Sequence, residues 1–278
     1  VASDNLASSG GVTLSATGDI TASKVGERGT ELISDAGDLP NAQNASNLVL
    51  TADGAITLAG LRTTSTDDLR VTAGGPVAFS DASGEIGGDF RVFSNAGVSF
   101  GASVLTAQSD SRLEGSALRF GTEDPNEARS ELIATDGGFI LRAYSGDILN
   151  YGSLLQGKTT TSGDPDSLGG LTIIAAGELL NRSLSVDRLA VAFGEEDDLH
   201  IETGGDIRNE TGRLFSNGGI TIRAGGDILN ETLFTEDAAP LSVTRSKGSR
   251  FASSLFLKRS RTTEVSADFG DQAIAGEQ

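Results

Sequence analysis

The sequence repeats one short pattern eight times, and the best copies lie 21 residues apart. The segment 220-ITIRAGGDILN-230 aligns with 199-LHIETGGDIRN-209 and, less closely, with six other segments. The copies begin at residues 12, 48, 69, 90, 140, 171, 199 and 220. In each copy, apolar residues alternate with polar ones before a small residue, and another apolar residue follows. Self-similarity at such an interval is the signature of a repeat architecture.

Two positions of the pattern predict β-strands. Position one is apolar in all eight copies, and position three is apolar in seven, with Arg142 as the exception. An apolar residue at every second position is the period of a strand that buries one face. A unit of two or three short strands buries little by itself, but stacked copies share a continuous core.

We therefore predict an all-β fold, a right-handed parallel β-helix with coils of about 21 residues. About 11 to 12 coils, each ~4.8 Å high, would form a rod on the order of 55 Å long. An antiparallel sandwich or a β-propeller is the alternative, but a propeller blade needs about 40 residues and its own motifs.

Two further positions carry small or polar residues with an expected structural role. Glycine at position seven permits a tight bend where a positive φ is needed. These repeat glycines are Gly18, Gly54, Gly75, Gly146, Gly177, Gly205 and Gly226. Asparagine at position eleven suits a turn, and its side chains in stacked coils can hydrogen-bond one another as a ladder. The expected ladder consists of Asn150, Asn181, Asn209 and Asn230.

Polar segments interrupt the repeat within a shaft that we place at residues 1–237. The interruptions fall at 21–46, 121–130, 155–168 and 194–198. We interpret them as loops that leave the rod. Loops on one face of a solenoid are common binding sites, and the alternative is tolerated variation in length.

The C-terminal part differs in charge from the rest of the chain. Residues 238–268 read as an extra-helical excursion, a probable β-hairpin, and we expect the β-helix to resume at 269–278. Six basic residues lie within the excursion: Arg245, Lys247, Arg250, Lys258, Arg259 and Arg261. They form either a contact patch for an acidic partner or a solvated hairpin. Because open ends of a β-helix need caps or more coils, we interpret the chain as part of a longer filament.

Composition excludes several functions. The net charge of −18 argues against nucleic-acid binding, which needs a basic footprint. No run of 18 apolar residues exists, so we expect no membrane span. The only histidine, His200, occupies an outward position of its repeat, which predicts a surface side chain. The acidic run at 195–198 reads as a solvated turn. We therefore expect no catalytic residue, no metal and no cofactor, with a β-helical polysaccharide lyase or hydrolase as the alternative.

The repeat resembles a known family. The segment 204-GGDIRNETGRLFSNGGITIRAGGDILNET-232 looks like the haemagglutinin repeat of filamentous-haemagglutinin-type exoproteins of two-partner secretion systems. The tail RSRTTEVSADFGDQAIAGE resembles a non-helical stretch of the same exoproteins and of contact-dependent inhibition effectors. The match is good over 131–278 and loose over 1–130.

The resemblance implies a fragment of a longer exoprotein that is secreted through an outer-membrane β-barrel partner to the bacterial cell surface. It implies an adhesive shaft, monomeric along its length, that binds a cell-surface receptor or glycan and contributes to virulence. The alternative that it offers is the stalk of a toxin-delivery protein in contact-dependent growth inhibition.

Overall fold

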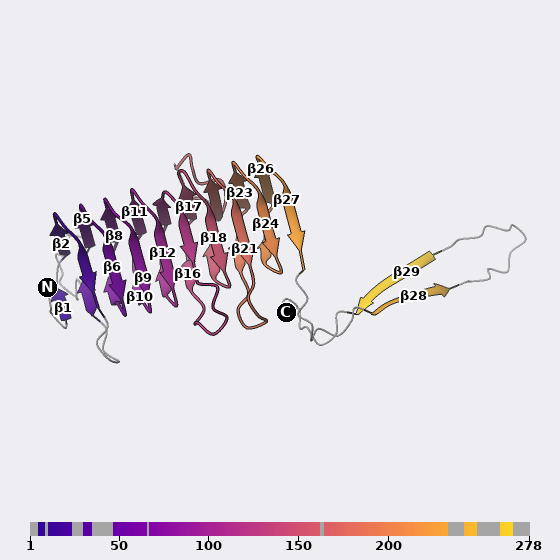
Figure 1. Ribbon diagram of the computed structural model, residues 1–278, viewed down its shortest axis with the longest axis horizontal. Coiled ribbons are helices and arrows are strands. Elements are labelled where there is room, and N and C mark those ends of the chain that lie inside the picture. The colour runs from indigo at the N-terminus through magenta and orange to yellow at the C-terminus, as the bar shows by residue number, and fades with distance from the viewer. Residues whose placement is uncertain are drawn as a thin grey trace, which may run out of the picture. The chain divides into compact units, whose positions relative to one another are not determined.

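The computed structural model describes residues 5–8, 11–23, 30–34, 47–65, 67–161, 164–232, 242–248 and 262–268. All of the regular elements in these residues are β-strands. Residues 1–232 form one compact unit and residues 233–278 a second. In the first unit the strands stack in parallel rows (Figure 1).

Three nine-stranded sheets build the first unit. Sheet A contains β1 (Asn5–Ser8), β4 (Glu31–Ser34), β7 (Arg62–Ser65), β10 (Ser83–Ile86), β13 (Val104–Ala107), β16 (Glu131–Ala134), β19 (Leu154–Gly157), β22 (Val191–Gly194) and β25 (Arg213–Ser216). Sheet B contains β2 (Val12–Ala16), β5 (Leu48–Ala52), β8 (Leu69–Ala73), β11 (Phe90–Ser94), β14 (Ser111–Gly115), β17 (Phe139–Ala143), β20 (Leu171–Ala175), β23 (Leu199–Thr203) and β26 (Ile220–Ala224). Sheet C contains β3 (Ile20–Ala22), β6 (Ile56–Ala59), β9 (Val77–Ser80), β12 (Val98–Gly101), β15 (Leu118–Phe120), β18 (Ile148–Tyr151), β21 (Leu179–Arg182), β24 (Ile207–Glu210) and β27 (Ile228–Glu231).

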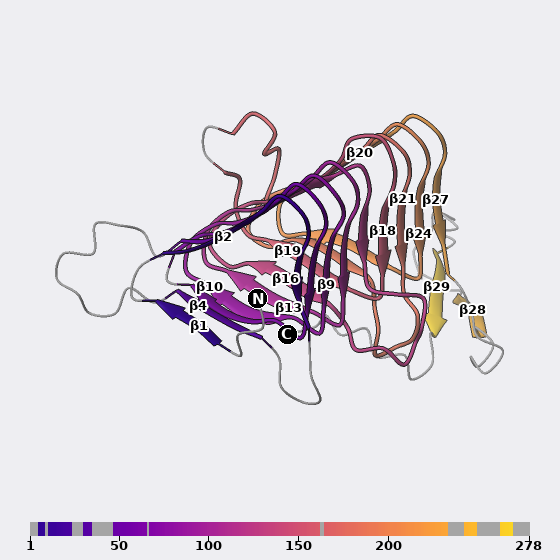
Figure 2. The ribbon, with the colours of Figure 1, turned by 60° about the vertical axis from the view of Figure 1, so that its left-hand side comes forward.

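Each coil supplies one strand to each sheet, and every neighbouring pair within these sheets is parallel. The result is a right-handed parallel β-helix, as the sequence predicted (Figure 2). The described residues form nine coils, so the expectation of 11 to 12 was too high. The difference arises because insertions lengthen several coils beyond 21 residues.

The predicted alternation places apolar side chains inside. In β8, Leu69, Val71 and Ala73 are buried while the intervening Arg70 and Thr72 are exposed. The same positions in successive coils stack directly, since Leu69 pairs with Leu48 on one side and with Phe90 on the other. The removal of such side chains from water contributes most to the stability of the shaft.

The structure corrects the repeat frame in two places. Phe139, not Ile140, aligns with Leu171 of the next coil, so position three is Leu141 and Arg142 points outward. One additional residue between β17 and β18 concealed this shift. A further coil begins at Ser111, which pairs with Phe90 and Phe139. The sequence pattern missed this coil because serine replaces the apolar residue at position one.

The repeat glycines do not adopt positive φ angles, contrary to the expectation. The requirement at most of them is close packing between coils. A Cβ atom on Gly75 would lie 2.9 Å from the carbonyl carbon of Gly54, which is too close for any side chain. A Cβ atom on Gly18, in the first of these turns, would meet no atom within 4 Å, so Gly18 lacks this constraint.

Positive φ angles occur instead at the corner between sheets C and A. The residue after the sheet C strand is left-handed in six coils: Gly60, Asp81, Ala102, Gly121, Gly152 and Thr211. In five of these coils the chain passes from sheet C to sheet A within two residues, and after Gly121 the insertion at 121–130 intervenes. The residue types of this column vary, which explains why no sequence motif marked it.

The interruptions of the repeat contain both loops and strands. β3 ends within 21–46 and β4 lies inside it, and β19 extends into 155–168 as far as Gly157. Residues 121–130 contain no strand, and 195–198 form the turn between β22 and β23. The sequence did not identify a further insertion at residues 183–190, between β21 and β22.

The second unit contains one pair of antiparallel strands, β28 (Ser242–Gly248) and β29 (Thr262–Asp268). Arg245 and Lys247 lie in β28. The other four basic residues of the proposed contact patch, and the resumption expected at 269–278, lie outside the described residues.

Candidate binding surface

The four asparagines at position eleven are joined by hydrogen bonds through successive coils. Asn150 Nδ2 donates to Asn181 Oδ1 over 2.9 Å, and Asn181 Nδ2 donates to Asn209 Oδ1 over 2.8 Å. Asn209 Nδ2 donates to Asn230 Oδ1 over 2.7 Å. The side chains lie at the third position of the sheet C strands and face inward, so Asn150 and Asn181 are each only 1% exposed. The asparagines therefore serve the shaft rather than an exposed site.

The aspartate of the Gly-Asp motif has a role that the sequence did not reveal. Its carboxylate accepts a hydrogen bond from a backbone N–H one coil further along. The pairs are Asp19 with Ala55 N, Asp147 with Glu178 N, and Asp206 with Asp227 N, at 2.7 to 2.9 Å. At Asp206 this N–H is the main cause of a pKa below the ordinary aspartate value. The aspartates of the motif recur at the spacing of one coil, and this recurrence could have predicted the contact. Aspartate is so common in turns, however, that the recurrence did not stand out.

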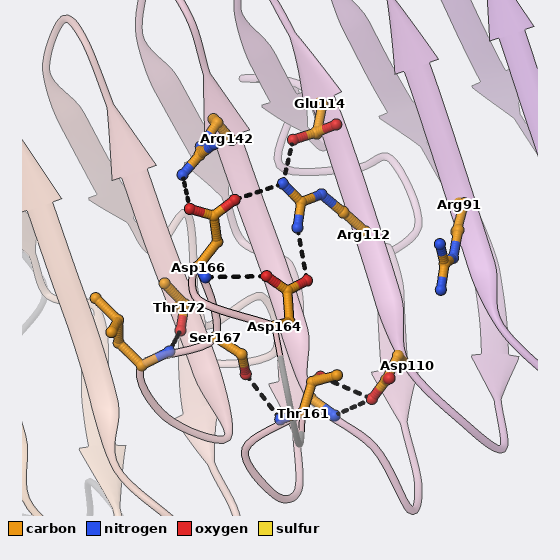
Figure 3. Close-up of polar contacts among 12 residues, drawn as sticks. Arg91, Asp110, Arg112, Glu114, Arg142, Thr161, Asp164, Asp166, Ser167 and Thr172 are labelled. Carbon is orange, nitrogen blue, oxygen red and sulfur yellow. Dashed lines mark hydrogen bonds and ion pairs between the residues drawn. The ribbon is translucent and has the colours of Figure 1, made fainter.

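The insertion after β19 folds back over the outer face of sheet B (Figure 3). We call the described residues of this insertion, 158–161 and 164–170, the docked loop. Arg112 donates to Asp164 and to Asp166, at 2.8 Å in each case, and also to Glu114. Arg142, one coil further on, donates to the other oxygen of Asp166 at 2.6 Å. Two arginines of the shaft thus hold two carboxylates of the loop.

The preceding coils show what is unusual about Arg112. Arg70, Arg91 and Arg112 occupy one column of sheet B. Arg70 and Arg91 each pair with the aspartate two residues before them, Asp68 and Asp89. Arg112 turns instead to the loop (Figure 3). Asp110 is the aspartate two residues before Arg112, and it accepts hydrogen bonds from Thr161 Oγ1 and Gly138 N instead.

These contacts keep the loop carboxylate ionised. The guanidinium of Arg112, followed by that of Arg142, lowers the pKa of Asp166 below the usual aspartate value. Burial lowers the pKa of Arg112, but its hydrogen bonds to Glu114 and then to Asp166 outweigh this effect, so the pKa of Arg112 is raised. Docking of the loop is therefore an electrostatic interaction of partly buried, hydrogen-bonded groups, the stronger kind of ion pair.

The column of Arg112 continues through Ile140, Thr172 and His200, and the docked loop contacts it. Leu168 N donates to Thr172 Oγ1 over 2.9 Å, so the loop crosses the column at this point. His200 points outward, as its parity predicted, but it is only 6% exposed, so the expectation of a surface histidine was wrong. Its Nε2 lies 3.7 Å from Glu202 Oε2.

A second pair of insertions meets at the corner between sheets C and A. Arg188, in the insertion that the sequence missed, is 4% exposed. Its guanidinium donates to the carbonyl oxygens of Asp124 and Tyr151. Residues 121–130 and 183–190 are thereby tied together across the intervening coil.

The acidic run at 195–198 has structural partners rather than the geometry of an acid–base pair. The carboxylates contact Gln156 Nε2 (Glu195), Lys158 Nζ (Glu196), Thr160 Oγ1 (Asp197) and Gly219 N (Asp198). The Thr160 hydroxyl is the main cause of the lowered pKa of Asp197. The run joins the docked loop to the next coil.

Neither a metal site nor a membrane-spanning helix occurs in the described part of the chain. No group of three or more His, Asp or Glu side chains there is placed to hold a metal ion. The same residues contain no helix long and apolar enough to cross a membrane.

Comparison with protein families gives a match to the haemagglutinin repeat over residues 1–60, 41–77, 64–183 and 189–235. The chain belongs to the haemagglutinin-repeat family. The match extends through residues 1–130, where the resemblance read from the sequence was loose. The haemagglutinin-repeat match ends at residue 235, so the resemblance of the tail remains a prediction. No curated protein and no solved structure matches this haemagglutinin-repeat chain.

Proposed function

We propose that the chain is a structural and adhesive shaft segment of a large secreted bacterial surface filament. The observation that carries the proposal is the unbroken stack of nine coils made of haemagglutinin repeats. Such repeats belong to secreted, surface-associated adhesins, which supports a location outside the cell. A rigid rod holds side chains at fixed intervals along its outer faces, which suits repeated contacts with a surface.

An attachment assay tests the proposal. Beads coated with the full chain are mixed with epithelial cells and with abiotic surfaces, and bound beads are counted by flow cytometry and microscopy. We expect saturable attachment that the soluble chain inhibits by competition. Beads coated with an unrelated acidic β-helix are the control for charge and shape. Attachment no greater than that of the control beads would contradict the adhesive role and leave the chain only the role of a spacer.

The secretion route is part of the proposal. Family membership supports export through an outer-membrane β-barrel partner of a two-partner system. Co-expression of the natural full-length gene with and without its neighbouring transporter gene tests this route. The chain is expected at the cell surface only when the transporter is present.

The stalk of a contact-dependent toxin-delivery protein is the second candidate. The observation that brings it in is the tail from Arg259 to Glu277, whose sequence resembles a stretch of inhibition effectors as well as of the filamentous exoproteins. The sequence of the complete gene distinguishes the two candidates, because a delivery protein carries a toxin domain and an immunity gene follows it. Polysaccharide cleavage has weaker support, since all four carboxylates at 195–198 have structural partners.

A further inference from the structure

Two exposed aromatic side chains lie together on the outer face of sheet B. Phe93 belongs to β11, and Tyr144 follows β17 two coils further along. They are 37% and 47% exposed, and their ring centroids are 6.4 Å apart. Glu114 of the intervening coil is in register with Phe93 on one side and with Arg142, two residues before Tyr144, on the other. Burial, followed by a hydrogen bond to Glu114, raises the pKa of Tyr144 to about 12, so the phenol stays protonated.

A hollow of about 360 Å³ adjoins Tyr144 on the side away from Phe93. It spans the ends of β17, β20 and β23. Ile174 and the small residues Ala176 and Gly204 line it, and Arg142 and Glu202 supply its charged groups. Phe93, Tyr144 and the hollow thus form a continuous strip along the rod axis, which we call the aromatic strip.

We propose that the aromatic strip binds an uncharged saccharide. A flat aromatic ring beside a shallow, mostly apolar hollow suits the C–H face of a sugar ring. The carboxylates of Glu114 and Glu202 accept hydrogen bonds, which sugar hydroxyls donate. This inference rests on the proposed adhesive function and assigns that function a ligand class and a place.

Charge selects an uncharged sugar over a sulfated or sialylated one. The two guanidinium groups beside the strip, Arg112 and Arg142, are already bound to Asp164 and Asp166 of the docked loop. Glu202, whose side chain is 52% exposed, and Glu114, which Arg112 also contacts, place two carboxylates at the strip itself. Together with a net charge of −18, these carboxylates repel a polyanion.

The docked loop prepares the strip for binding. Asp166 accepts a hydrogen bond from Arg112, and Arg112 donates to Glu114 at 2.8 Å, which holds this carboxylate near the Tyr144 phenol whose pKa it helps to raise. This chain of contacts fixes the ring before a ligand arrives, which lowers the entropy lost on binding. It also explains why the insertion folds over this part of sheet B.

A glycan array tests the proposal. The labelled full chain is applied to immobilised neutral, sialylated and sulfated oligosaccharides, and hits are measured again by titration calorimetry. We expect binding to neutral oligosaccharides that end in hexose or N-acetylhexosamine. Absence of binding to every neutral oligosaccharide overturns the proposal, and so does a preference for the sulfated or sialylated ones.

Three variants locate the binding. Tyr144→Ala is expected to weaken binding by about tenfold or more, because a central aromatic anchor is lost. Tyr144→Phe retains the ring and is expected to keep most of the affinity. Phe215→Ala removes a similarly exposed aromatic residue on sheet A, 40% exposed, and is the matched control. Equal loss in Tyr144→Ala and Phe215→Ala, or no loss in Tyr144→Ala, overturns the assignment.

The attachment assay separates this inference from the proposed function. Attachment by the wild-type chain that Tyr144→Ala leaves unchanged supports an adhesive shaft and overturns the aromatic strip as its binding site. Attachment that falls with Tyr144→Ala, and that the neutral sugar identified on the array inhibits, supports both. Saccharide binding through Tyr144 without attachment supports the strip and counts against the adhesive role.

Discussion

Phe120 and Asn150 occupy the same position of successive coils and pair in register, although one is aromatic and the other polar. On one side of this junction Phe79, Phe100 and Phe120 stack with nearly parallel rings. On the other side the four asparagines form their ladder. One column of the core therefore changes from stacked rings to stacked amides between β15 and β18.

Replacing Asn181 by alanine should destabilise the C-terminal coils. The amide of Asn181 both donates to Asn209 and accepts from Asn150, and it is 1% exposed. Its loss leaves a buried donor hydrogen on Asn150 and a partly buried acceptor on Asn209 without partners, at a cost of about 2–3 kcal/mol. Urea unfolding, followed by hydrogen exchange of β18, β21 and β24, measures the effect.

The control for that change is Asn230→Ala at the exposed end of the ladder. Among the described residues it removes one hydrogen bond, to Asn209, and should cost about 1 kcal/mol or less. Equal effects of the two substitutions would show that continuity of the ladder contributes nothing.

The aromatic half of the column should be more sensitive to truncation. Phe100 is 1% exposed and contacts the rings of Phe79, Phe90 and Phe120. Phe100→Ala opens a cavity in the stack and should lower the free energy of unfolding by about 3–5 kcal/mol. Phe215→Ala on the surface is the comparison, with an expected change below about 1 kcal/mol. A midpoint of denaturation unchanged by Phe100→Ala would contradict the close packing of these rings.

The shaft could be predicted from the sequence because two patterns that are visible in the sequence itself determine it. Alternation fixed the inward residues, and the 21-residue interval fixed which residues stack. The frame failed at residue 140, where one extra residue shifts Phe139 into register with Leu171. It also missed the coil at Ser111, because position one there is polar.

The outer surface could not be predicted in the same way. The alternation of the strand correctly predicted that His200 points outward. The burial of His200 depends on the residues that lie over its column, and alternation contains no information about them. The pairing of Arg112 with Asp164 joins residues 52 apart through a loop whose path no periodicity describes. Phe93 and Tyr144 likewise meet only because the coils stack, with the coil of β14 between theirs.

Glycine in the left-handed column should be harder to replace than glycine in the repeat motif at Gly18. Gly152 has a φ of +58°, and a Cβ there would lie 2.8 Å from the carbonyl oxygen of Arg188. Gly152→Ala should destabilise the shaft by about 1–3 kcal/mol, since both strain and contact oppose it. Gly18→Ala meets no atom within 4 Å and should be nearly neutral. Thermal unfolding of both variants, measured by circular dichroism at one protein concentration, gives the comparison, and an equal loss in the two would refute the steric explanation.

Acid should release the docked loop before it unfolds the shaft. Arg112 and Arg142 hold the pKa of Asp166 below its ordinary value, so the ion pairs stabilise docking fully above the unpaired aspartate pKa of about 4. This stabilisation is lost as the pH falls further, through the lowered pKa of the docked carboxyl. Hydrogen exchange at Leu168 N, which donates to Thr172, should therefore rise relative to that of core strands below about pH 4.

The variant Asp166→Asn separates this cause from general acid effects. It removes the charge that both arginines contact, keeps the size of the side chain, and should weaken docking by about 1 kcal/mol at neutral pH. Its loop should then exchange faster at pH 7 and show a smaller further increase on acidification than the wild type. Asp89→Asn, which removes the partner of Arg91 outside the loop, is the matched control and should leave exchange at Leu168 unchanged. An acid response of Leu168 identical in Asp166→Asn and the wild type would show that another group controls the loop.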